Sequence, residues 1–218
     1  MMHLKKFLIL LGLSVALFFS GCATTFSGAY SQKVDPNEVI NPHDTILVTT
    51  NKDDIASKYY VDDVIYHLNK RGFDMVYSYT DANIPPVKYK MVIRVYKKTT
   101  SYKYNSADYG PISTGTVRTN CYKEGKVTRC VTTPNQTYGI IGYSQKIRYL
   151  HGHYFIMTVY NTQTQEKVFV AKSSTFETSC DNMTLYRFLI DETIKRMNFH
   201  RPMEYKFSVK MPDGFTCQ

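Results

Sequence analysis

Apolar and polar residues alternate over several short segments of this chain, which is the pattern of half-buried β-strands. The longest such segment is residues 87–98, where most alternate side chains are apolar and many of the intervening ones are basic. Further strands are expected at residues 45–50, 73–79, 144–150, 154–161 and 166–177. Strands with one apolar face predict a mostly antiparallel sheet that is covered on that face.

Two other segments repeat their apolar residues at helical spacing. Residues 55–71 follow the capping candidates Asp53 and Asp54 and end before Gly72. Residues 183–198 follow Asp181-Asn182, which can cap a helix. We therefore predict an α+β fold, a single domain over residues 44–218 in which two helices cover one face of the sheet.

Residues 99–142 break this pattern, because Thr, Ser, Asn, Gly and Tyr dominate them. We interpret them as an insertion that carries a β-hairpin. Its centre is symmetric about Gly125-Lys126, and glycine at the first loop position suits a two-residue turn. Counting outward from that turn, Cys121 and Cys130 face each other where Cα atoms lie ~4.5 Å apart, within the range of a disulfide. The hairpin is therefore expected to be closed by a disulfide bond.

The amino terminus contains two lysines, an apolar run over residues 7–19, and then Ser20-Gly21-Cys22. This run rises only ~20 Å as a helix, less than the roughly 30 Å of hydrocarbon in a bilayer, so a cleaved signal is favoured over a membrane-spanning helix. The segment resembles a bacterial lipoprotein signal peptide over residues 1–21. The resemblance implies that Cys22 is acylated and, since Ala23 follows it, that the protein is anchored on the periplasmic face of the outer membrane.

Ordinary secretory cleavage beside Gly21 and Cys22, which releases a soluble protein, is the alternative to lipid anchoring. Residues 22–43 lack periodicity and are expected to form a tether between lipid and domain. About 20 flexible residues have a mean span of ~25 Å, so the domain is expected to lie close to its membrane.

With Cys22 assigned to lipid, four cysteines remain, and an even number fits two disulfides in an oxidising compartment. Because Cys121 and Cys130 pair in the hairpin, Cys180 and Cys217 are left to pair with each other. Free thiols or zinc ligands are the alternative, although no C-x-x-C pair is present to start a zinc site.

The net charge of +9 becomes +7 when the two lysines of the signal are removed. For an exported protein this charge indicates an acidic envelope protein, an anionic glycan or lipid headgroups as partners, and no nucleic acid is expected. A solvated surface with surplus lysine is the simpler interpretation.

Patterns for catalysis are weak. Ser144 lacks the closing glycine of a nucleophile elbow, and no phosphate-binding glycine loop is present, so we expect no enzyme activity and no cofactor. His151 and His153 would share one face of a strand but have no third ligand nearby in the sequence, so no metal site is predicted.

Tyrosine is the remaining signal, with 19 Tyr and no Trp, several of them between basic residues. A rigid aromatic ring with a polar tip suits the recognition of proteins or glycans. The candidate partner-binding residues are Tyr59, Tyr66, Tyr96, Tyr102 and Tyr104. The alternative is that tyrosine is simply favoured in half-buried strands.

Several short motifs carry a wider resemblance: the signal, the strand at residues 46–48, Gly72-Phe73, residues 81–83, the turn at residues 159–162 and the last helix. Over residues 44–199 the chain is similar to outer-membrane lipoproteins of unknown function that have a small α+β periplasmic domain. It is more remotely similar to the amino-terminal domain of TolB, the curli-secretion lipoprotein and the lipoprotein activators of penicillin-binding proteins. None of these relatives has a catalytic motif to carry across. From the anchor, the weak catalytic patterns and the tyrosines among basic residues, we hypothesise a lipid-anchored, non-enzymatic interaction or assembly module of the cell envelope. A glycan-binding or small-ligand-binding lipoprotein is the alternative.

Overall fold

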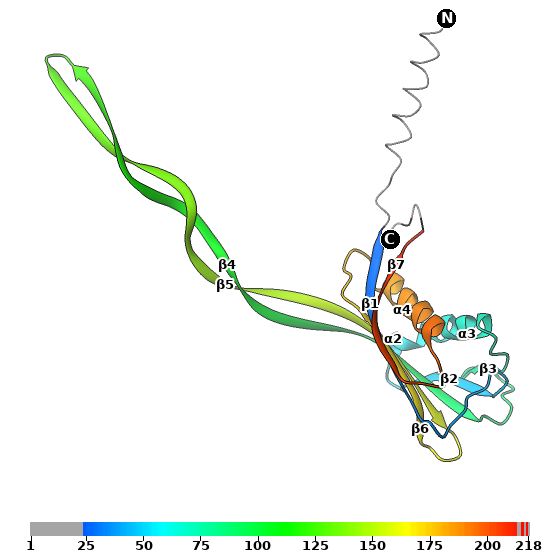
Figure 1. The fold of residues 1–218 in the computed structure, drawn as a ribbon. Coiled ribbons are helices and arrows are strands. Elements are labelled where there is room, and N and C mark those ends of the chain that lie inside the picture. Colours follow the sequence, from blue (N-terminus) through cyan, green and yellow to red (C-terminus); the bar gives the residue numbers. More distant parts are fainter. Residues whose placement is uncertain (1–23, 213–214, 216, 218) are drawn as a thin grey trace, which may run out of the picture. The chain divides into compact units, whose positions relative to one another are not determined.

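The computed structural model describes residues 24–212, 215 and 217, so Cys22 and the expected signal lie outside the described residues. The chain forms two compact units (Figure 1). One unit, called the body here, comprises the residues up to Thr99 and from His151 onward. The other unit, called the arm, is Thr100–Leu150.

The described residues form a seven-stranded sheet with the order β3-β2-β4-β5-β6-β1-β7. The strands are β1 (Thr25–Val34), β2 (Ile46–Thr50), β3 (Val76–Ser78), β4 (Tyr89–Glu124), β5 (Val127–Asn161), β6 (Lys167–Thr175) and β7 (Met203–Lys210). β2 runs parallel to both β3 and β4, whereas β6 is antiparallel to β5 and β1, and β1 is antiparallel to β7. The sheet is mixed, and the prediction of a mostly antiparallel sheet was wrong.

The parallel pairing of β2 and β3 follows from the two helices between them, α2 (Ile55–Lys58) and α3 (Val61–Lys70). Parallel neighbours need a long crossover connection, and the helices provide it. Helix α4 (Asn182–Arg196) begins after Asp181, whose carboxylate accepts hydrogen bonds from the amides of Met183 and Thr184. The predicted pair of helices on one face was also wrong, because the expected first helix is interrupted at Tyr59 and Tyr60.

The core lies in the body, where buried side chains alternate along the strands and meet the apolar faces of α3 and α4. α3 contacts β2, β3 and α4, and α4 also contacts β6. The largest fully buried side chains are Tyr30, Tyr89, Phe26, Phe155, Phe169, Ile46, Leu68, Met91, Ile93, Met157, Leu185 and Leu189. This core belongs to one unit, so the body has its own source of stability.

β1 is part of the sheet, although residues 22–43 were expected to form a tether. It pairs with β6 over residues 29–34 and with β7 over residues 25–32. Phe26 is fully buried, and its ring meets Phe188 edge-on at 5.2 Å between centroids. The Tyr30 hydroxyl donates to Oε1 of Gln32 at 2.6 Å. The tether prediction was therefore wrong for residues 25–34.

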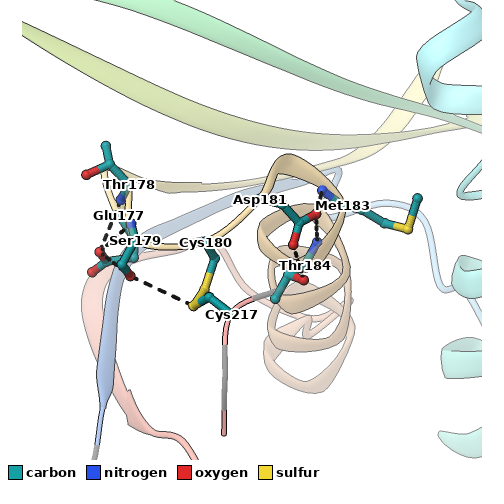
Figure 2. The surroundings of a disulfide bond; sticks show 8 residues. All are labelled: Glu177, Thr178, Ser179, Cys180, Asp181, Met183, Thr184 and Cys217. Carbon is teal, nitrogen blue, oxygen red and sulfur yellow. Dashed lines mark hydrogen bonds between the residues drawn. A yellow bond between two sulfur atoms is a disulfide. The ribbon is translucent and has the colours of Figure 1, made fainter.

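The disulfide between Cys180 and Cys217 confirms the second predicted pair (Figure 2). It joins the residue before the α4 N-cap to the carboxyl-terminal segment, with 4.6 Å between the two Cα atoms. Glu177 stands beside it and accepts a hydrogen bond from the Ser179 hydroxyl at 2.9 Å and from the amides of Thr178 and Ser179. Burial raises the pKa of Glu177, but these hydrogen bonds lower it more, so the net pKa lies below its ordinary value.

The replacement Phe26→Ala tests whether β1 is part of the core. We expect a loss of about 3–5 kcal/mol in the free energy of unfolding, because a buried phenyl ring is replaced by a cavity. The matched control is Phe176→Ala, whose ring is half exposed and should cost less than about 1 kcal/mol. Denaturant unfolding followed by circular dichroism measures the free energy of unfolding of both variants. Equal losses would contradict the place of residues 25–34 in the core and would support a tether.

Candidate interaction surface

The arm continues β4 and β5 as a two-stranded ribbon, drawn in green in Figure 1. The complete strands have 36 and 35 residues. The roughly 25 residues per strand within the arm give a ribbon of about 80 Å at ~3.3 Å per residue. Strands in globular proteins are usually about 3–10 residues long, so this ribbon is far outside the ordinary range.

Side chains of the arm are uncovered. The arm is described in full, and its one buried residue, Gly110, has no side chain. Its large exposed hydrophobic residues are Tyr102, Tyr104, Tyr109, Ile112, Val117, Tyr122, Val127, Val131, Tyr138, Ile140, Ile141, Tyr143, Ile147 and Tyr149. Seven basic and two acidic residues give the arm a net charge of +5. A surface that is both aromatic and basic is therefore presented to solvent.

The tip of the arm is closed as predicted. Cys121 and Cys130 form a disulfide with 4.0 Å between their Cα atoms, which confirms the first predicted pair. Between β4 and β5 stand two turn residues, and Gly125 has φ of +66°. A positive φ at the first loop position alone is the pattern of a type II′ turn, which glycine adopts without steric cost.

Polar side chains hold the two strands of the arm together where no core does. The hydroxyls of Thr119 and Thr132 lie 2.9 Å apart. Nδ2 of Asn135 donates to the Thr116 hydroxyl at 3.0 Å, and the Thr133 hydroxyl donates to a β4 carbonyl at 3.3 Å. Cross-strand pairs of this kind contribute roughly 0.2–1 kcal/mol each. They fix the register of the ribbon and leave its aromatic side chains free.

The arm is longer than the expected insertion at residues 99–142. It extends to Leu150, so the segment 144–150, which was expected to be a core strand, belongs to the arm. In the body, β5 is buried in alternation from His153 to Val159. Residues 144–150 do form part of a strand, β5, as their alternation predicts. The arm has no core for their apolar side chains to face.

The five predicted tyrosines do not form one surface. Tyr59 and Tyr66 are 76% and 61% exposed and belong to the helical segment, at the C-cap of α2 and within α3. Tyr102 and Tyr104 lie in the arm, with ring centroids 6.1 Å apart. Tyr96 is half-buried on the sheet of the body.

Tyr96 takes part in a group that the sequence did not reveal. Its ring stacks on Tyr154 of β5, with centroids 4.9 Å apart and planes 8° from parallel. The guanidinium of Arg94 lies 5.1 Å from the centroid of Tyr96, and Nζ of Lys172 lies 5.0 Å from that of Tyr154. The pKa of Tyr96 is raised, first by burial and then by Tyr154, and the nearby Arg94 offsets part of the rise. Pairing across three strands brings these four side chains together.

His151 and His153 differ in their surroundings. Nδ1 of His151 lies 3.0 Å from the Thr99 hydroxyl. His153 is buried, and its Nε2 lies 2.8 Å from the Asn182 side-chain oxygen while Nδ1 has no hydrogen-bond partner. Burial lowers the pKa of His153, the hydrogen bond to Asn182 raises it, and the neighbours Lys97 and His151 lower it further, so the net pKa is below 6.5. Within the described residues, no group of three side chains is arranged to hold a metal.

A further polar group lies under the loop between β1 and β2. Glu38 accepts hydrogen bonds from the Tyr89 hydroxyl at 2.8 Å and from Nδ2 of Asn161 at 2.6 Å. The pKa of Tyr89 is raised, first by burial and then by this hydrogen bond. The Glu38 carboxylate thus joins the loop to β4 and β5. These contacts account for Glu38 by a structural role, without a functional one.

Comparison with protein-family models and with curated proteins gives no match. Among solved structures, a PelC dodecamer variant from Paraburkholderia phytofirmans is 10% identical, with a TM-score of 0.41, and the likeness covers 77% of this chain and 94% of that chain. A PDZ domain protein from Parabacteroides distasonis is 8% identical, with a TM-score of 0.37, over 88% of this chain and 41% of that chain. Neither likeness carries an argument about function.

No helix in the described part of the chain has the length and apolar character needed to cross a bilayer.

The double replacement of Cys121 and Cys130 by serine tests the independence of the tip. We expect faster hydrogen exchange of arm amides near the turn, because the disulfide limits the open states of the ribbon. The unfolding midpoint of the body should stay within about 2 °C, because the body has its own core. A fall of the midpoint by 5 °C or more would contradict this independence.

The buried His153 predicts a pH dependence of stability. The unfolded chain, in which histidine titrates near 6.5, binds the proton more readily than the folded body, so stability is complete above this pH and falls below it. The slope from one proton is at most about 1.4 kcal/mol per pH unit. Denaturant unfolding between pH 7 and pH 5 should show a smaller slope for His153→Gln than for the control His151→Gln, and equal slopes would refute the assignment.

Proposed function

We propose that this protein is a non-enzymatic, lipid-anchored interaction module of the bacterial cell envelope, and that the arm engages its partner. One observation carries this proposal: the arm exposes fourteen large hydrophobic side chains and contributes none to the core. An isolated two-stranded ribbon is at best marginally stable in water. Contact with a partner would bury these side chains and stabilise the ribbon.

The edges of the arm support the same proposal. β2 pairs with β4 only over residues 89–93, and β6 pairs with β5 only over residues 153–160. Within the described residues, no other strand extends these pairings to the arm. Unpaired backbone groups on a strand edge can bind an extended segment of another protein, and exposed tyrosines add anchors of the kind found at interface centres. The charge of +5 favours a partner with an acidic surface.

Anchoring to the outer membrane through Cys22 is the second part of the proposal. Its support is the resemblance of residues 1–21, which precede Cys22, to a lipoprotein signal peptide, together with two disulfides, which persist in oxidising compartments. β1 begins at Thr25, three residues after Cys22 in the sequence, and three residues span at most ~10 Å. An acylated Cys22 would thus hold the first strand of the body beside the outer membrane, closer than a 20-residue tether would.

Site-specific photocrosslinking in living cells tests this function. A photoreactive amino acid in place of Tyr138 or Tyr143, which are 75% and 71% exposed on the arm, should give discrete crosslinked species. The controls are Tyr59 and Tyr66, which are 76% and 61% exposed and lie in the helical segment of the body. Crosslinks only from the body positions, or none from the arm, would contradict the proposed role of the arm.

Removal of the arm provides the complementary measurement. The hydrogen bond between Thr99 and His151 brings the two ends of the body's strands together, so an Asn-Gly turn can replace residues 100–150. The shortened protein should keep the unfolding midpoint of the body within about 5 °C because the core is unchanged. It should also lose at least about nine-tenths of the complex captured by an affinity tag after crosslinking, since hot-spot contacts dominate association. A folded protein with undiminished capture would reject the arm as the contact.

A further inference from the structure

The sheet of the body has a second face, opposite the core. On β4 the core takes Tyr89, Met91, Ile93 and Val95, so the residues between them lie on the other side. β6 and β1 alternate in the same way, with Lys172 and Lys33 on the side away from the core. We call this side of β4, β5, β6, β1 and β7 the open face.

Positive charge dominates the open face. Its basic residues include Lys90, Arg94, Lys167, Lys172, Lys33 and Lys206. Within the described strands, the same face carries one carboxylate, Glu204 of β7. Excess charge of one sign on one face raises the local concentration of ligands with the opposite sign.

A hollow of about 690 Å³ lies on this face. It is lined in part by Ser31, Lys33, Lys167, Val170, Lys172 and Glu204. The register places Lys172 opposite Ser31 and Val170 opposite Lys33, so cationic side chains alternate with a hydroxyl and an apolar one. The hollow therefore offers charge, hydrogen-bonding groups and an apolar floor at one place.

The stacked pair Tyr96 and Tyr154 extends this surface toward β4. Arg94 lies over the ring of Tyr96 and Lys172 over the ring of Tyr154, so each cation has an aromatic partner that positions it. Cation–π contacts of this kind contribute roughly 0.5–1 kcal/mol at exposed sites. A preorganised cation binds an anion at a smaller entropic cost than a free lysine does.

The spread of these cations determines the size of the ligand. Five neighbouring strands at about 4.8 Å apart span ~19 Å between β4 and β7. One small anion cannot contact cations so far apart. A ligand that contacts all of these cations must carry negative charges at intervals, as a polymer does.

We propose that the open face binds an acidic polysaccharide. Hydroxyls of Ser31, Ser174 and Thr158 stand among the cations on this face and suit a hydroxyl-rich chain. The half-exposed Phe176 follows β6, with its ring 6.4 Å from that of Tyr154, and this single ring beside many cations is too little apolar surface to enter a bilayer. The surface therefore fits a polysaccharide better than a lipid membrane. This ligand is separate from the partner of the arm.

Binding of the full-length protein to immobilised alginate and polygalacturonate tests the proposal, with dextran as the uncharged control. The triple variant Arg94→Gln, Lys172→Gln, Lys33→Gln should weaken binding by about tenfold to a hundredfold, because three charge contacts are lost. Binding of the unmodified protein should weaken as sodium chloride rises from 50 to 300 mM. Salt screens exposed charges over the Debye length, which is ~10 Å at about 0.1 M and shortens as the salt concentration rises.

The matched control removes the same charge from the arm through Lys123→Gln, Lys126→Gln and Arg129→Gln. It should bind within about twofold of the unmodified protein, since these residues lie outside the open face. Equal weakening by both triple variants would show that net charge alone is responsible and would overturn the proposal. So would the absence of binding to both polysaccharides, or binding only to vesicles containing phosphatidylglycerol.

Discussion

The pairing of β4 with β5 is the interaction on which the rest of the molecule depends. In the body these strands are central, and their inward side chains, from Tyr89 to Val95 and from His153 to Val159, form much of the core. In the arm the same two strands remain paired while their side chains are uncovered. The backbone pairing between these two strands thus continues through the arm, but the outer edges of the ribbon are unpaired and the gain from apolar burial ends with the body. This difference makes the arm a surface available to another molecule.

Features fixed by neighbouring residues were predictable. The Cys121–Cys130 disulfide and its turn follow from ten consecutive residues, and α4 begins where Asp181 can cap it. β1 was not predicted because two of its core-facing positions, Gly28 and Gln32, lack apolar side chains, so the alternation of a strand is not visible in the sequence. A Cβ on Gly28 would lie 2.6 Å from the Phe207 ring, so the strand needs glycine there. Gln32 is buried because it bonds the backbone of Asn198 and Arg201, which are distant in sequence.

The candidate surface was only partly predictable for a related reason. Alternation shows which residues share a face, but not where the core that covers the face ends. Tyr96 therefore looked like Tyr102 and Tyr104, although the first packs on Tyr154 and the others belong to the arm. The parallel pairing of β2 likewise depends on long-range partner choice, because its five residues are compatible with either direction. Tyr154, Arg94 and Lys172 become a group only once β4, β5 and β6 are paired.

Cysteine labelling compares the arm in the purified protein with the arm in its cellular setting. Single variants Tyr138→Cys and Tyr59→Cys, both at strongly exposed positions, would be exposed to a small water-soluble maleimide. If a partner covers the arm, Tyr138→Cys should react at least about fivefold more slowly in cells than in purified protein, while Tyr59→Cys reacts at equal rates. Equal rates for Tyr138→Cys in both settings would contradict a partner-binding arm.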